Sequence, residues 1–398
     1  MKRIFLTAMG LSMLLTSIKA QTSATDSSEY KSRKLKIDEI NLVSSYYTQN
    51  GNNASVTGGI GSEKLNDFAN VLDINFVRYD KHLRKHSIGV EFGIDHYTSA
   101  SSDMIDTKAN SSASHADTRI YPAINYNIEN ESKGTTIGMG LSSSTEFDYQ
   151  SYGANINFSA KTKNRNGEFT AKFQTYLDQV SIIKPIELRP PQSIDDENYP
   201  NSSRNTFAGS LSYSQIINKQ LQVMFLTDIV KQQGYLSLPF HRVYFKDGSV
   251  HQENLPGTRL KIPLGFRASY FVGDKFIIKA YYRFYHDDWG LTAHTADFEL
   301  PVKITPFVSL SPFYRFYTQT AIKYFAPYKL HTAQDQYYVS NYDLSKFKSN
   351  FFGTGVRIAP PKGIFNKQHF SMIELRYGHY AKNIGMNSDI ISMNLKFK

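Results

Sequence analysis

The chain has 398 residues, with 27 tyrosines, 27 phenylalanines, one tryptophan, no cysteine and a formal net charge of +10. Without cysteine it can form neither disulfides nor a thiolate metal site, so its stability must come from hydrogen bonding and burial. The basic residues are scattered, with no run of five or more, and this argues against a nucleic-acid partner.

The chain opens with a segment typical of export. Residues 1–20 combine Lys2 and Arg3 with a short apolar run and a small residue, Ala20. This pattern predicts a cleaved secretory signal peptide, because the apolar run is too short to span a bilayer. Residues 21–35 are polar and lack periodicity, so we predict a flexible leader. Residues 36–398 are expected to form one domain.

Along this domain, about 16 segments alternate apolar with polar or small residues, which is the pattern of a strand with one apolar face. Helical periodicity is almost absent. In residues 220–232 both faces carry apolar groups, so the register of that segment stays open. The clear segments are 88–94, 119–128, 136–141, 153–158, 260–267, 276–285, 296–303 and 391–397. The less clear ones are 37–49, 67–79, 168–179, 206–216, 220–232, 308–319, 349–359 and 370–380.

The connections alternate in length. Short turns are expected at 80–85, 130–134, 161–167, 217–219, 272–274, 305–307 and 360–369. Long loops are expected at 50–66, 99–117, 181–205, 233–258 and 320–348. This asymmetry, with strands of about 10–13 residues, predicts an all-β fold: an antiparallel transmembrane β-barrel of about 16 strands, with short periplasmic turns and long extracellular loops. A closed barrel pairs every backbone group that would otherwise lie unsatisfied in lipid.

The alternation also assigns the two faces of the wall. A charge facing lipid at mid-depth costs about 2–4 kcal/mol, so the charged positions are expected to face the lumen. They either line a water-filled pore or pair with one another as structural ion pairs. The lumen-facing candidates are Glu91, Asp95, Arg119, Arg267, Arg283, Arg315, Arg357, Glu374 and Arg376.

The stretch SIGVEFGIDHY, residues 87–97, illustrates the prediction. Its apolar residues should contact lipid, while Gly89 and Gly93 leave room inside. We expect Tyr97 at the outer membrane interface, where barrels carry an aromatic girdle.

Three groups of residues could carry chemistry, and none has a specific motif. Asp287 and Asp288 are weak metal candidates without EF-hand or HExxH spacing. Glu146 and Asp148 are paired carboxylates on a hairpin, where no catalytic cleft is expected. His241 lies among many serines, but no G-x-S-x-G elbow accompanies it. We therefore predict no catalytic residue, no cofactor and no metal.

Six strings carry a family resemblance. They are SVTGGIGSEKL (55–65), SSASHADTRIYP (111–122), STEFDYQSYG (144–153), LPFHRVYF (238–245), YYRFYHDDWGLTAHTADFELPVKITPF (281–307) and YDLSKF (342–347). The sequence resembles the exported bacterial domain-of-unknown-function family 3570. The resemblance implies a predicted outer-membrane β-barrel of Bacteroidetes-like, Gram-negative bacteria. It implies no reaction.

We therefore expect an outer-membrane, porin-like channel or transporter, with membrane lipid and a small, undefined solute as partners. Insertion by the barrel-assembly machinery is expected, and the oligomeric state stays open. The loop 181–205, with Pro190, Pro191, Asp195, Asp196 and Glu197, could fold inward as a constriction. The alternative is a non-conducting barrel whose extracellular loops bind a partner, glycan or cation. A barrel hydrolase is the third possibility.

Overall fold

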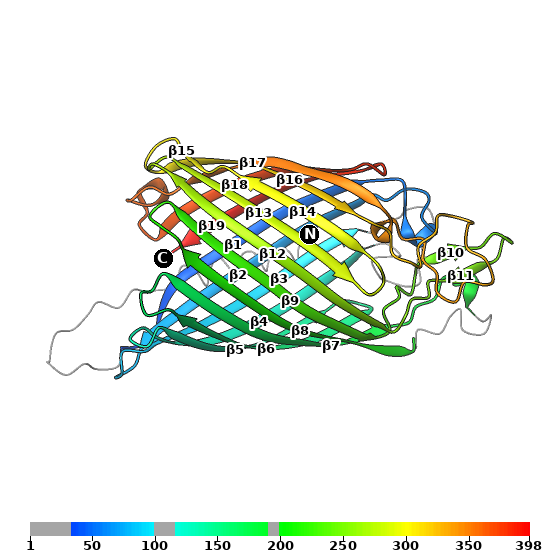
Figure 1. Ribbon diagram of the computed structural model, residues 1–398, viewed down its shortest axis with the longest axis horizontal. Coiled ribbons are helices and arrows are strands. Elements are labelled where there is room, and N and C mark those ends of the chain that lie inside the picture. The colour runs from blue at the N-terminus through cyan, green and yellow to red at the C-terminus, as the bar shows by residue number, and fades with distance from the viewer. Residues whose placement is uncertain (1–32, 99–115, 190–198) are drawn as a thin grey trace, which may run out of the picture.

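The computed structural model describes residues 33–98, 116–189 and 199–398. They form a closed antiparallel β-barrel whose strands are strongly inclined to the long axis (Figure 1). The strands β14 and β15 are two pieces of one strand, interrupted at Leu300 and Pro301, so the ring has 16 strands. The predicted fold class is confirmed. The predicted signal peptide and most of the leader lie outside the described residues.

The first half of the ring consists of β1 (Lys36–Asn50), β2 (Leu65–Tyr79), β3 (Lys85–Thr98), β4 (Ala116–Asn130), β5 (Thr135–Thr145), β6 (Tyr149–Lys161), β7 (Gly167–Ser181) and β8 (Asn201–Ile216). The second half consists of β9 (Leu221–Gly234), β12 (Thr258–Val272), β13 (Phe276–Asp287), β14 (Thr292–Glu299), β15 (Val302–Lys303), β16 (Val308–Gln319), β17 (Phe347–Ile358), β18 (Phe370–Lys382) and β19 (Met386–Phe397). A separate hairpin is formed by β10 (Arg242–Tyr244) and β11 (Val250–Gln252), and the short 3₁₀ turns are η1 (Ser55–Thr57), η2 (Ile186–Leu188), η4 (Tyr342–Leu344) and η5 (Ile364–Asn366).

The first and last strands close the ring. β1 pairs with β2 on one side and with β19 on the other, from Ile40 opposite Phe397 to Asn50 opposite Asn387. Each strand of the ring therefore has a neighbour on both sides, and the sheet has no free edge. This arrangement satisfies the backbone without help from solvent.

The two ends of the barrel differ. The tight turns and the C-terminus lie at one end, while β10, β11 and the described parts of the longer loops gather at the other (Figure 1). We call these the short-turn end and the long-loop end. Three connections at the long-loop end are nevertheless short: residues 146–148 between β5 and β6, 288–291 between β13 and β14, and 383–385 between β18 and β19.

The outer surface of the barrel is apolar, unlike the surface of a protein that is surrounded by water. On β5 and β6, Ile137, Leu141 and Ile156 are each at least 60% exposed. Exposed apolar residues that alternate along the strands form one face of the sheet, as the sequence pattern predicts. No helix in the described part of the chain is long and apolar enough to cross a membrane.

The pairing register settles the ambiguous segment 220–232. Leu226 of β9 lies opposite Ser212 of β8, and Met224 lies opposite Arg267 of β12. These apolar side chains share a face with polar ones, while Phe225 and Ile229 lie on the outer, exposed face. Both faces are thus partly apolar, which explains why alternation alone left the register open.

Candidate functional site

A single ion pair identifies the inner face of the barrel. Arg376 of β18 lies 3.5 Å from Glu299 of β14, although β16 and β17 stand between these strands in the ring. Side chains can bridge such a gap only on the concave side of a closed sheet. The face that carries Arg376 and Glu299 is therefore the inner one, opposite the exposed apolar side chains.

All nine lumen-facing candidates lie on this inner face by register. Asp95 of β3 is directly opposite Arg119 of β4, and Arg357 of β17 is directly opposite Glu374 of β18. The structure joins Arg376 to Glu374 at 3.2 Å. The whole set does not form one cluster, because the nine residues are distributed over seven strands: β3, β4, β12, β13, β16, β17 and β18.

Several inner charges were not among the candidates. Lys279, Asp297 and Glu299 lie on the inner face of β13 and β14, and Asp297 accepts two bonds of 2.6 Å from Arg315. Lys279 lies 3.8 Å from Glu299. The signal that would have found them is the same alternation, since Asp297 and Glu299 flank the outward Phe298.

Tyr97 corrects one expectation about residues 87–97. It has the same parity as Glu91 and Asp95, and its hydroxyl donates to Glu146 at 2.5 Å. Tyr97 therefore points inward and does not belong to a lipid-facing girdle. The side chain was placed outside because of its residue type, although the alternation places it inside.

The room beside Gly93 is also occupied. Gly93 lies opposite Tyr121 of β4, and a Cβ atom on Gly93 would lie 2.0 Å from the Tyr121 ring. The Tyr121 hydroxyl donates to Asp95 at 2.8 Å. Glycine is thus required here so that an aromatic ring can lie flat against the inner wall.

The middle of the wall formed by β4, β5 and β6 is polar and uncharged. Gly138 and Gly140 of β5 are flanked on the inner face by asparagines, which are Asn125 and Asn127 of β4 and Asn155 and Asn157 of β6. Amide groups hydrate well without carrying charge. This side of the lumen therefore differs chemically from the arginine-rich side formed by β12–β18.

At the long-loop end, residues 51–64, 182–189, 235–257 and 320–346 form a structured unit that we call the cap. Arg242 of β10 is only 3% exposed, donates to both carboxylate oxygens of Glu187, and donates to the carbonyl of Val56 at 2.9 Å. Although burial opposes its ionisation, the bond from Arg242 holds the pKa of Glu187 below its usual range.

Three of the strings behind the family resemblance meet in this cap. Gly58, with φ +77°, lies against the Tyr244 ring, and Gly59 lies against Ser340 and Tyr342. Residues 55–65, 238–245 and 342–347 thus contact one another although they are distant in sequence. Their specific residue types serve the packing of the loops.

Asp287 and Asp288 join the tips of β12 and β13 through hydrogen bonds. Asp287 is 1% exposed and accepts from Arg259 at 2.5 Å and from Tyr285 at 2.7 Å. Asp288 accepts from the backbone N–H of Leu260 at 3.1 Å. Nearby, Trp289 belongs to an apolar cluster with Leu255, Leu291, Ala293, Ile322 and Val339. Since the Asp287 carboxylate already serves Arg259 and Tyr285, it suits an ion pair better than a metal.

A different carboxylate group lies near the rim. One oxygen each of Asp117, Glu146 and Asp148 lie within 4.8 Å of one another. Burial and the neighbouring Glu146 and Asp117 raise the pKa of Asp148 to about 6. Glu146 and Asp148 were noted as a pair in the sequence, whereas Asp117 fell in a predicted loop and could not be connected with them.

His241, the histidine considered for a hydrolase, contacts a carboxylate. Its Nδ1 lies 2.9 Å from a carboxylate oxygen of the buried Glu253. Among the described residues, no serine hydroxyl hydrogen-bonds to the other ring nitrogen. The predicted constriction at Pro190, Pro191, Asp195, Asp196 and Glu197 lies outside the described residues.

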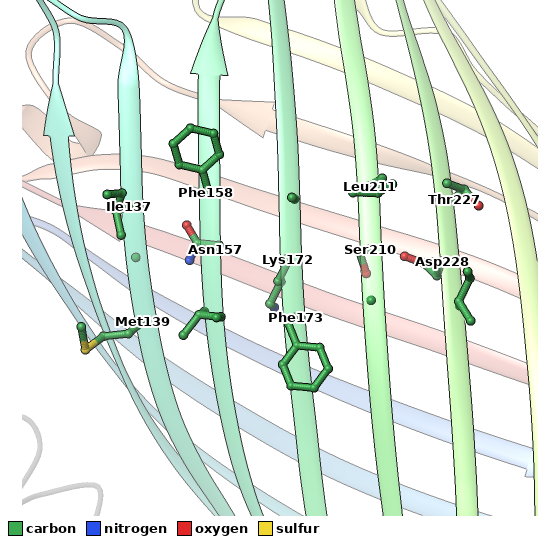
Figure 2. A pocket seen from close by; sticks show the side chains of 15 residues that line it. Ile137, Met139, Asn157, Phe158, Lys172, Phe173, Ser210, Leu211, Thr227 and Asp228 are labelled. Carbon is green, nitrogen blue, oxygen red and sulfur yellow. The ribbon is translucent and has the colours of Figure 1, made fainter.

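A hollow of about 680 Å³ lies on the outer wall over β5–β9. Figure 2 shows the apolar side chains around it, which include Ile137, Met139, Phe158 and Phe173. A Cβ atom on Gly209, within the hollow, would meet nothing within 4 Å. Because this surface is apolar and belongs to the outward face, we interpret it as a contact for acyl chains.

These features define a closed β-barrel with an apolar exterior, a charged inner wall and a structured cap. Residues 97–388 match the family described as "Protein of unknown function (DUF3570)". The chain belongs to this family, as the resemblance predicted. No curated protein matches it.

Solved outer-membrane barrels show a distant likeness in shape. The ferric enterobactin receptor PfeA of Pseudomonas aeruginosa is 12% identical with a TM-score of 0.47, over 86% of this chain and 53% of the receptor chain. This chain thus spans about half the length of that receptor. Pseudomonas aeruginosa OpdK, in a structure with vanillate, is 6% identical with a TM-score of 0.41, over 90% of this chain and 97% of that one. The monoaromatic hydrocarbon channel TodX is 8% identical with a TM-score of 0.40, over 90% and 89%.

Proposed function

We propose that this protein is an outer-membrane channel that passes small polar solutes through its charged lumen. The observation that carries the proposal is the two-faced wall, apolar outside and polar inside. A barrel of 16 strands is wide enough to hold a water-filled path. The apolar exterior suits the hydrocarbon layer, and export with signal-peptide cleavage and insertion by the barrel-assembly machinery would bring the chain there.

The inner arginines favour anions over cations on one side of the lumen. Arg267, Arg283 and Arg357 make no ion pair within 4.0 Å among the described residues, whereas Arg315 and Arg376 do. Unpaired charge along a pore wall raises the local concentration of counter-ions. We therefore expect Arg283 to raise anion permeability and Glu91, on the facing half of the ring, to raise cation permeability.

Conductance of the folded, purified chain in planar bilayers tests the proposal. Wild type should form stable conducting steps, Arg283→Gln should shift the reversal potential toward cation preference, and Glu91→Gln should shift it toward anion preference. Ser45→Ala, a neutral change on the inner face, is the matched control. A folded barrel that never conducts would contradict the channel role, as would variants with unchanged selectivity.

The cap supports a second candidate function. In this alternative the barrel binds a partner, glycan or cation at the cell surface. The cap's buried Arg242 and its apolar cluster around Trp289 give the loops a fixed shape, and preorganised loops favour binding. A non-conducting wild type with an intact cap would favour this role. Esterase and lipase turnover on the folded chain would instead favour a hydrolase.

A further inference from the structure

The inner wall contains a small cavity of about 160 Å³, which lies over the strands from β14 to β19. We propose that this cavity binds a small zwitterion, specifically an α-amino acid with an apolar side chain. The inference rests on the proposed function, because a wall site serves a solute that travels through the lumen.

The floor of the cavity is apolar and depends on two glycines. Gly353 of β17 and Gly378 of β18 face each other in the sheet. A Cβ atom on Gly378 would lie 2.5 Å from the Phe351 ring, and one on Gly353 would lie 2.8 Å from the Phe313 ring. The two rings, 5.1 Å apart between centroids, thus lie against bare backbone and form a surface for an apolar side chain.

Charges of both signs lie at one edge of this floor. Asp297 and Arg315 form one pair, and Glu299 lies 3.5 Å from Arg376, whose guanidinium lies 5.1 Å from the centroid of Phe313. The charged residues that line the cavity are thus two bases and two acids, so the edge is neutral as a whole. A ligand that is neutral overall but carries separated charges fits this edge better than a simple anion or cation.

The charges at this edge have capacity left for a ligand. Arg376 contacts its acids through Nη1 alone, so Nε and Nη2 have no hydrogen-bond partner among the described residues. The side chains of Arg315 and Arg376 are 49% and 35% exposed on the lumen side. Exposed ion pairs contribute little to stability, so a ligand can exchange with them at low cost. A ligand carboxylate can bind Arg376 through two parallel bonds, and an ammonium group can bind Glu299 and Asp297.

The geometry of an α-amino acid matches this arrangement. Its carboxylate and ammonium groups sit on one carbon, as the acids and bases share one edge, and its side chain extends from that carbon toward the phenylalanine floor. The cavity of about 160 Å³ is small and suits a ligand the size of a single amino acid.

Calorimetric titration of the full-length, detergent-folded chain tests the site with three probes. These are L-phenylalanine, 3-phenylpropionate, which lacks the ammonium group, and 2-phenylethylamine, which lacks the carboxylate. Wild type should bind L-phenylalanine about tenfold more tightly than either analogue, because each charged contact contributes about that factor. This ranking needs no variant, so a folding defect cannot obscure it.

Two variants then separate the contacts. Arg376→Gln should weaken L-phenylalanine and 3-phenylpropionate about tenfold and leave 2-phenylethylamine unchanged, while Glu299→Gln should weaken L-phenylalanine and 2-phenylethylamine and spare 3-phenylpropionate. Arg165→Gln, which removes a charge at the short-turn end and outside the cavity, should change none. Absence of saturable L-phenylalanine binding, or equal loss of all three probes in both variants, would overturn the site. Binding with this crossover in a barrel that does not conduct would instead overturn only the channel proposal.

Discussion

Arg242 and Glu187 form a two-point ion pair that joins loops 55 residues apart in sequence, and the same arginine reaches the carbonyl of Val56. Three cap segments therefore share one buried guanidinium. A buried guanidinium without a partner carboxylate is costly, so the stability of the cap depends on this ion pair.

We expect Glu187→Gln to loosen the cap without unfolding the barrel. Removing one partner of a buried ion pair costs about 3–5 kcal/mol, and here that cost falls on the loops. Trypsin should cleave faster after Lys246 and Lys329 in folded protein. Arg165→Gln, which removes an exposed pair with Glu131 at the short-turn end, is the control and should leave cleavage unchanged. Equal cleavage in both variants would contradict the role given to the buried pair.

Gly93→Ala should destabilise the barrel by about 1–3 kcal/mol, because the new methyl group would meet the Tyr121 ring. Unfolding in urea, followed from lipid vesicles, measures the loss. The Tyr121→Ser variant removes the ring. Adding Gly93→Ala to that variant should therefore cost much less stability than Gly93→Ala costs in the wild type. An equal cost would mean that the ring does not lie over Gly93.

Two adjacent residues on β6 test the assignment of the faces. Ile156→Lys puts a charge on the outer surface and should cost about 2–4 kcal/mol if that surface meets lipid. Asn157→Lys puts the same charge on the inner wall and should cost much less. The comparison uses refolding yield and urea unfolding in vesicles. Equal costs would remove the basis for an apolar outside and a wet inside.

The cap should close more tightly at acidic pH because of Glu63. Burial and repulsion by Asp343 raise the pKa of Glu63 to about 7, from an ordinary value of 4.5. Between these values the closed loop holds a proton that the open loop releases, so closure weakens as the pH rises through this window. Because Glu63 stays partly exposed, solvent screening keeps the effect below the roughly 3 kcal/mol that corresponds to the full pKa difference. Hydrogen exchange across residues 51–64, corrected for its intrinsic pH dependence, measures it.

Glu63→Gln is the comparison for this pH effect. An amide does not titrate, so exchange in the variant should follow the intrinsic dependence alone. If the variant retains the same pH-dependent protection as wild type, another group is responsible.

The barrel could be predicted because its wall repeats one local rule. Ile88, Val90, Phe92 and Ile94 alternate with small or acidic residues, and most strands contribute the same contrast. Tyr97 was placed wrongly because its residue type, which suits the membrane interface, was given more weight than its position in the alternation. Local pattern therefore decided the face of a side chain better than composition did.

The cap and the wall cavity could not be predicted, because both depend on contacts between distant segments. Nothing in the sequence near Arg242 indicates that Glu187 and Val56 lie beside it. Likewise, Gly353 and Gly378 each appear as a gap in a strand, and only the pairing of β17 with β18 shows that together they support two phenylalanine rings.

The seam between β1 and β19 has a consequence for how the protein forms. Ile40 and Phe397 pair across the seam, so closing the ring joins residues separated by nearly the whole described chain. Contacts so distant in sequence form slowly. Until then both seam strands expose an unpaired edge, which is a template for aggregation. The chain is therefore most prone to aggregation between its synthesis and the closure of the ring.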